Sequence, residues 1–212
     1  EHASAELGGV AAEETLRLLS HVSPHADTDF RDVPPTRDTF LTPQPATLYG
    51  VPAPPEPWAQ VTFPPDVPRM GILSHASFLA GHAHAVSSSA TLRGKAVRTI
   101  LLCDEIFPPP VDVDTSIPEA SGTTPTLRDR VAEHLTSPSC KGCHSLMDPI
   151  GLALESFDAV GMERLQENGV TIDTSGELDG VPYADAAGLG QALSEHPNLG
   201  PCLVRNLYRY SL

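Results

Sequence analysis

The most constraining feature of the chain is a five-residue run, Cys-Lys-Gly-Cys-His, at positions 140–144. Two cysteines three positions apart at the start of a helix present their sulfur atoms on one face. They can form thioethers with the two vinyl groups on one edge of a porphyrin, while the next residue offers an imidazole to the iron. C-x-x-C-H is the attachment signature of a c-type haem. We therefore predict one covalent haem c on Cys140 and Cys143, with His144 as the proximal iron ligand.

Two other uses of a C-x-x-C pair stay open on the sequence alone. A dithiol redox motif is expected within a βαβ pattern, which the neighbouring sequence does not show. A structural zinc site usually needs four ligands in two paired clusters, and the sequence has one such cluster. Covalent haem is the interpretation that we favour.

The other two cysteines, Cys103 and Cys202, complete the four in the chain. In an oxidising compartment they would form one disulfide, and the alternative is a pair of buried thiols. Haem c is attached outside the cytoplasm, so both inferences agree on a periplasmic or secreted protein.

The formal net charge of −14 argues against nucleic acid and anionic membrane surfaces as partners. An acidic surface suits a basic redox partner protein, although it also suits any acidic soluble protein. No stretch approaches the roughly 20 apolar residues of a membrane span. The chain has no initiator Met and no secretory signal, so we expect a processed or excised chain.

Apolar periodicity predicts a mainly α fold with Pro-rich irregular straps and one short β-hairpin. More than half of the 22 prolines lie between Pro24 and Pro68, which excludes long regular elements there but leaves short helical turns at 39–41 and 48–50. Asp148-Pro149 is expected to end the helix that the haem motif opens. Helices are expected at 3–22, 69–84, 90–103, 125–136, 140–148, 150–157, 185–195 and 201–212, and the hairpin at 170–180, turning at Ser175-Gly176.

Several segments resemble one family. RMGILSHASFLAGHAHAVSSSATLRGKAVRTILLC, followed by FPPP, resembles the opening of a planctomycete cytochrome C-type domain, and SCKGCHSLMDPIGLALESFDAVG resembles its haem segment. IDTSGELDG and CLVRNLYRYSL resemble the small domain that follows, and FLTPQPATLYGVP resembles the end of the domain that precedes. The resemblance covers residues 36–212 and implies a small helical, cytochrome-c-like haem domain in a secreted or periplasmic protein, without implying a substrate.

The resemblance divides the chain into three parts. Residues 1–65 form the helical and Pro-rich tail of a preceding domain, residues 66–165 the haem c domain, and residues 166–212 a small module of a hairpin and helices. Relatives usually carry a further haem-bearing segment, so we expect this chain to be one part of a larger redox protein. Another haem-bearing segment or subunit of that system is then an expected partner.

A cytochrome that carries electrons usually has a sixth iron ligand, and here it must come from another segment. The candidates are Met70, His75, His82, His84, Met147 and Met162. Met147 follows His144 by three residues on one helix face and is expected to pack on the proximal side. We place His82 or Met162 first. Arg93 and Arg164 are candidate partners of the haem propionates, because guanidinium matches carboxylate geometry, and solvated surface charges are the alternative.

The predicted function is one-electron transfer, for which we assign no catalytic residue. A peroxidase- or oxygenase-like haem enzyme is the alternative, and it would need an open iron position with a distal polar group such as His82 or His75. A third alternative is a binding or scaffold module that the haem merely staples together.

Overall fold

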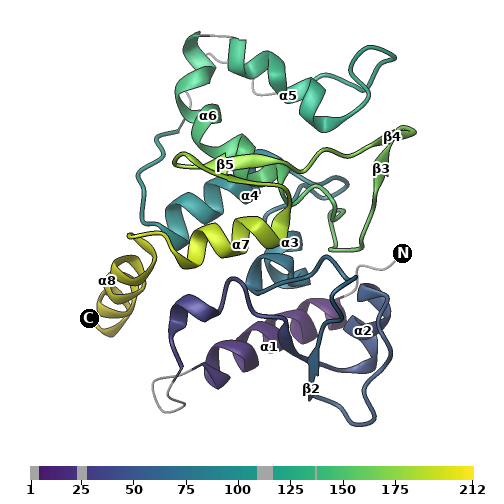
Figure 1. Ribbon diagram of the computed structural model, residues 1–212, viewed down its shortest axis with the longest axis vertical. Helices are drawn as coiled ribbons and strands as arrows, with labels where there is room; N and C mark the ends of the chain where they lie inside the picture. Colours follow the sequence, from purple (N-terminus) through teal and green to yellow (C-terminus); the bar gives the residue numbers. More distant parts are fainter. Residues whose placement is uncertain (1–4, 23–27, 109–116, 137) are drawn as a thin grey trace.

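The computed structural model describes residues 5–22, 28–108, 117–136 and 138–212. Over these residues the fold is mainly α, as predicted, with eight α-helices and three two-stranded antiparallel pairs (Figure 1). The α-helices are α1 (Ala5–His21), α2 (Pro43–Tyr49), α3 (Ala76–Gly81), α4 (Ala90–Ala96), α5 (Leu127–Thr136), α6 (Pro138–Leu152), α7 (Ala186–Ser194) and α8 (Leu199–Ser211). The short 3₁₀-helices are η1 (Phe30–Asp32) and η2 (Ile72–Ser74), and η3 (Val97–Leu101) is a π-helical turn. The strands are β1 (Asp38–Leu41), β2 (Ala59–Thr62), β3 (Gln166–Glu167), β4 (Val170–Thr171), β5 (Gly176–Leu178) and β6 (Val181–Tyr183).

The first part of the chain packs α1 against α2 and the strand pair β1–β2. The predicted helical turn at 39–41 is wrong, because the structure has β1 there. Thr39 and Leu41 are buried while Asp38 and Phe40 are partly exposed, which is the period-two pattern of a strand. Four residues are too few for that alternation to stand out in the sequence. The predicted turn at 48–50 is confirmed as the end of α2.

A buried polar cluster joins this part to the segment that precedes α3. Glu14 of α1 is fully buried and accepts hydrogen bonds from Thr39 (2.7 Å) and from the Tyr49 hydroxyl (2.6 Å). His75, 1% exposed, approaches Glu14 at 3.5 Å, and the Arg69 guanidinium lies 3.9 Å from the centre of the Tyr49 ring. Glu14, Thr39, Tyr49 and His75 each have a hydrogen-bond partner in the cluster, which makes their burial compatible with stability, whereas Arg69 Nε has none among the described residues.

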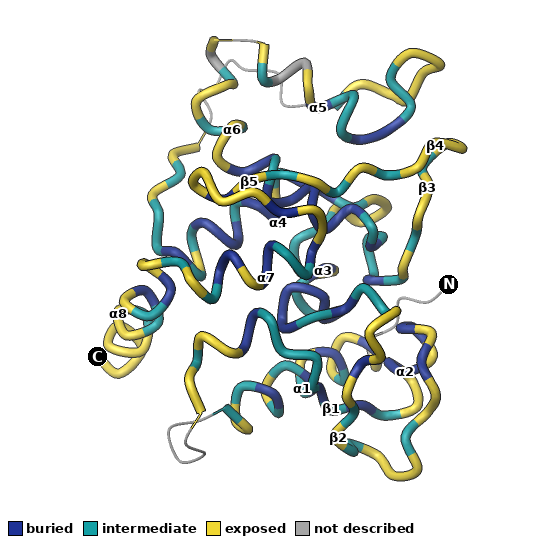
Figure 2. The backbone as a smooth tube through the Cα atoms, viewed as in Figure 1, coloured by how far each residue is buried: buried dark blue, intermediate teal, exposed yellow. Residues whose placement is uncertain are grey.

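The main core lies between η2, α3, η3, the end of α6 with the segment after it, the β5–β6 pair and α7 (Figure 2). Helices α4 and α6 cross at two glycines. A Cβ on Gly94 would lie 1.8 Å from the Met147 carbonyl oxygen, and a Cβ on Gly151 would lie 1.7 Å from that of Ala90. The two backbones therefore touch, and only glycine fits at either position.

Two predicted helix boundaries are wrong, and so is the separate helix predicted at 150–157, since residues 150–152 belong to α6 and residues 153–156 form a turn. The helix predicted at 69–84 is confined to η2 and α3. Gly71 has a φ of 55°, which is not a helical value, so the helical conformation cannot begin before η2. The helix that the haem motif opens does not end at Asp148-Pro149 but continues through Pro149 to Leu152. Proline removes one backbone donor and strains the preceding turn, so contacts with α4 must stabilise the helix there.

The single predicted hairpin is also wrong. The structure has two hairpins in that region, β3–β4 and β5–β6, and Ser175-Gly176 is not a turn, because Gly176 is the first residue of β5. The turns are Asn168-Gly169 and Asp179-Gly180, whose four φ values are all positive. Asn-Gly and Asp-Gly are the dipeptides that favour such two-residue turns, because these residues tolerate positive φ.

The chain ends in α7 and α8. Asp185 caps α7 by accepting a hydrogen bond from the Gly188 amide, and α8 lies at the edge of the molecule (Figure 1). Leu207 and Tyr210 of α8 are 59% and 93% exposed, whereas Leu199 and Cys202 are buried. Cys103 and Cys202 lie at disulfide distance, with 2.06 Å between their sulfur atoms, and this bond fastens α8 to the segment after η3.

No helix among the described residues combines the length and the apolar character needed to cross a membrane.

Candidate haem attachment site

Helix α6, labelled in Figure 1, contains Cys140, Cys143 and His144 in its first turns. Their spacing of i, i+3 and i+4 places the three side chains on one helix face. All three are partly exposed, and the His144 side chain keeps 21% of its accessible surface. A group approaching from outside the helix can therefore meet both sulfur atoms and the imidazole together.

A buried carboxylate orients the histidine. His144 Nδ1 donates a hydrogen bond of 2.9 Å to Asp148 Oδ2, one helical turn further along α6. Asp148 is fully buried, and its other oxygen accepts a 2.8 Å hydrogen bond from the Thr91 hydroxyl of α4. A carboxylate at Nδ1 fixes the tautomer of an imidazole so that Nε2 becomes the metal-binding nitrogen.

These residues fit a c-type haem by their chemistry. Two thiols with the required spacing and an adjacent imidazole are the donor set that covalent attachment and axial ligation need, and the Asp148 carboxylate orients that imidazole. The other two uses of the cysteine pair find no such support in the described residues. They contain no cluster of three or more His, Cys, Asp or Glu side chains suited to a metal ion, and their strand pairs are all antiparallel.

Arg93 is neither a surface charge nor exposed to a ligand. It is fully buried, and its guanidinium donates to the backbone carbonyls of Leu154 (2.9 Å), Phe157 (2.8 Å) and Asp158 (2.5 Å). Burial lowers the pKa of Arg93 to about 10, against the opposing effect of Glu155. Its role is to hold the segment that follows α6, so both interpretations made from the sequence are wrong.

The candidates for the sixth position lie in several environments. His75 belongs to the buried polar cluster, with Nδ1 at 2.9 Å from the Thr15 hydroxyl, and burial lowers its pKa. His82 Nδ1 lies 2.8 Å from the Phe78 carbonyl oxygen, and its ring contacts that of Phe78. Met162 packs on the apolar cluster of α1, α2 and β1. Of the others, Met147 is buried, His84 is exposed and Met70 is partly buried.

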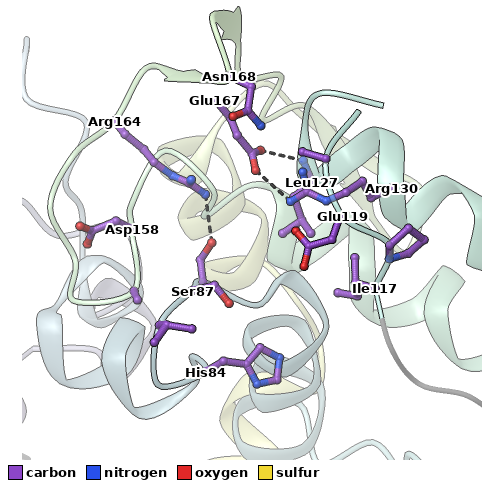
Figure 3. A pocket seen from close by; sticks show the side chains of 15 residues that line it. His84, Ser87, Ile117, Glu119, Leu127, Arg130, Asp158, Arg164, Glu167 and Asn168 are labelled. Atoms are coloured by element: carbon purple, nitrogen blue, oxygen red, sulfur yellow. Dashed lines mark hydrogen bonds and ion pairs between the residues drawn. The ribbon is translucent and has the colours of Figure 1, made fainter. Parts of the chain in front are cut away.

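A cavity of about 710 Å³ brings two further candidates together. His84 and Arg164 line it, along with Arg130, Glu167 and residues of the 117–120 segment (Figure 3). Arg164 donates to Glu155 and Ser88, and Arg130 donates to Glu167, so each arginine is paired with a glutamate. Among the described residues that line this cavity, none belongs to the Cys140–His144 motif.

The described residues form a mainly helical fold in which α6 carries the Cys140–His144 motif on a partly exposed face. Residues 69–167 match the family model PSCyt3, described as "Protein of unknown function (DUF1588)", the planctomycete cytochrome C-type domain family. The predicted resemblance is thus confirmed over these residues, and the family name implies a haem cofactor. No curated protein and no solved structure matches the chain.

Sequence reasoning missed Asp148 and Thr91 as parts of the site. The separation of four residues between His144 and Asp148 was a usable signal, because it places a carboxylate beside the imidazole on one helix face. Thr91 lies 57 residues away from Asp148 in the chain, and only the α4–α6 crossing brings the two together.

Proposed function

We propose that this chain is an extracytoplasmic c-type cytochrome domain that transfers single electrons within a larger redox protein or complex. The observation that carries the proposal is the joint presentation of Cys140, Cys143 and His144 on α6, with Asp148 holding the imidazole. A bound haem c supplies one-electron exchange at its iron.

The residues of the chain have separate roles in this proposal. Cys140 and Cys143 would provide the two thioether sulfurs, so that the cofactor cannot dissociate. His144 would provide the proximal ligand through Nε2. The proposed location outside the cytoplasm rests on this attachment chemistry and on the Cys103–Cys202 pair, since disulfides persist in oxidising compartments.

Cysteine-pair variants test the attachment with a matched control. The chain is expressed in a periplasm with haem c maturation, either unchanged, as Cys140→Ser/Cys143→Ser, or as Cys103→Ser/Cys202→Ser. The first pair of substitutions removes the proposed attachment, whereas the second removes the same number of cysteines elsewhere. Covalent haem is expected in the unchanged chain and in the second variant only. Equal haem content in both variants would overturn the proposal.

The sixth ligand separates an electron carrier from a haem enzyme. We propose His82 or Met162 for this position, at the expense of the hydrogen bond of His82 to Phe78 or of the packing of Met162 in its apolar cluster. A carrier shows a low-spin spectrum that is unchanged by cyanide or carbon monoxide. His82→Ala or Met162→Ala should convert it to a high-spin spectrum that responds to both. A wild-type spectrum that is already high-spin would instead support a peroxidase-like enzyme.

A partner of this domain would be another redox protein or a further haem-bearing segment of the same system. The net charge of −14 favours a basic docking surface on that partner. Electron transfer to a basic partner should therefore slow as salt is added, and a rate independent of salt would contradict this proposal.

A further inference from the structure

We propose that Asp148 is a positioning residue that strengthens His144 as an electron donor to iron and so lowers the reduction potential of the centre, and that Thr91 holds Asp148 in place for this role. The inference rests on the proposed haem attachment and deepens it. The attachment motif alone does not set the reduction potential, and the inference assigns part of its control to Asp148 of α6 and Thr91 of α4.

Both oxygens of the carboxylate are committed. Oδ2 accepts from His144 Nδ1 at 2.9 Å and Oδ1 accepts from the Thr91 hydroxyl at 2.8 Å. The threonine belongs to α4, whose backbone is pressed against α6 at Gly94 and Gly151. The carboxylate therefore cannot turn away from the imidazole without breaking a hydrogen bond across the tightest helix contact in the described core.

Solvent screens the charge of Asp148 only weakly from His144. The side chain of Asp148 is fully buried, where a hydrogen bond to a charged group is stronger than in water. In the described part of the chain Asp148 pairs with His144 and Thr91, and neither partner is an arginine or a lysine. The nearby Arg98 donates to the Leu146 carbonyl and is paired with Asp104 and Asp179 instead.

The consequence for iron follows from ligand basicity. A carboxylate that accepts the Nδ1 proton increases electron density on the ring and makes Nε2 a stronger ligand. A stronger donor stabilises ferric iron more than ferrous iron, because the ferric ion carries the larger charge. Second-shell hydrogen bonding is one of the means by which a protein tunes a haem potential. Asp148 is thus expected to favour the oxidised state.

The test is a spectroelectrochemical titration of the haem-loaded full chain. Asp148→Asn keeps the side-chain shape and removes the charge, and Thr91→Val keeps the charge and removes its anchor. Both variants are expected to have a higher reduction potential than the wild type, with unchanged haem content. Residues that hydrogen-bond to metal ligands typically contribute a factor of about 10–100 in metal affinity or activity. A tenfold change in the preference for ferric over ferrous iron corresponds to about 59 mV in the reduction potential.

Two control variants make the result specific. Asp66→Asn removes one exposed carboxylate and should leave the potential unchanged. Thr91→Ser restores the hydroxyl and should return the potential to the wild-type value. The electron paramagnetic resonance spectrum of ferric Thr91→Val should also change, since its g values report the orientation of the axial imidazole, which a general loss of stability would not alter.

The outcomes separate this inference from the proposed function. Covalent haem with equal potentials in the wild type, Asp148→Asn and Thr91→Val would overturn the role of Asp148 and leave the cytochrome intact. A wild-type chain without covalent haem would overturn both. If Asp148→Asn fails to fold, Thr91→Val against Thr91→Ser decides the question, because that pair leaves the buried charge in place.

Discussion

The α-carbon of Gly94 in α4 lies directly against the Met147 carbonyl in α6, so closely that a Cβ on Gly94 would be 1.8 Å from that oxygen. Met147 is three residues beyond His144, so the spacing between the two helices also sets the position of the haem motif relative to Thr91. The attachment site therefore depends on a backbone contact that no side chain can enter.

Gly94→Ala should destabilise the protein because the added methyl group must push α4 away from α6. Overpacking of this kind costs about 3 kcal/mol, which lowers the melting temperature by roughly 6–12 °C in a chain of this size. Thermal unfolding followed by circular dichroism measures the change. Gly200→Ala is the matched control, since no atom lies within 4 Å of a Cβ there, and it should be neutral or slightly stabilising. Equal melting temperatures for the two variants would contradict the close contact.

Reduction of the Cys103–Cys202 bond should lower the free energy of unfolding by about 4 kcal/mol. The two cysteines are 99 residues apart, so opening the bond gives the unfolded chain much more conformational freedom. Urea unfolding with and without a reductant measures the difference. The Cys140→Ser/Cys143→Ser variant should respond to the reductant in the same way as the wild type. An unchanged urea midpoint on reduction would show that the bond does not form or does not stabilise the fold.

Asp179 should stabilise the fold at neutral pH and lose this effect in acid. The hydrogen bond from Arg98, aided by His196, lowers the pKa of Asp179 from 3.8 to about 2. Because the folded-state value is depressed, the stabilisation is present above pH 4 and is lost as the pH falls towards 2. The Asp179 side chain is 46% exposed, so solvent screening limits the contribution to about 1 kcal/mol or less.

Asp179→Asn tests this pH dependence without changing the turn, since asparagine also tolerates the positive φ of 50° at this position. The variant should be less stable than the wild type at pH 7, and the difference should shrink between pH 4 and pH 2. Urea unfolding at several pH values measures it, with Asp66→Asn as the exposed control. A deficit of constant size across this range would argue against an ionic role for Asp179.

The features that the sequence predicted well depend on neighbours in the chain. Apolar periodicity predicted the helix at 185–195, which is α7 with Asp185 as its cap, and the start of a helix at 90, where the Ser89 hydroxyl accepts a hydrogen bond from the Leu92 amide. The haem motif is similarly local, since its three residues need only one helix. The two hairpins were missed, although Asn168-Gly169 and Asp179-Gly180 are equally local signals for their turns.

The features that the sequence could not predict depend on contacts between distant segments. Nothing in the sequence around Arg93 distinguishes it from a surface arginine. Its burial is explained by the backbone carbonyls after α6 that accept its hydrogen bonds. Leu92 of α4 and Ile100 of η3 are apolar but 37% and 50% exposed, whereas Arg93 is fully buried. Tertiary contacts thus overrode the apolar pattern.

The most direct test of the central claim is acid–acetone extraction of the periplasmically matured full chain, followed by mass measurement of the intact polypeptide. If Cys140 and Cys143 hold the cofactor through thioethers, the haem absorbance stays with the protein and its mass exceeds that of the bare chain by one haem. Haem recovered in the solvent, with a polypeptide of unmodified mass, would contradict the account.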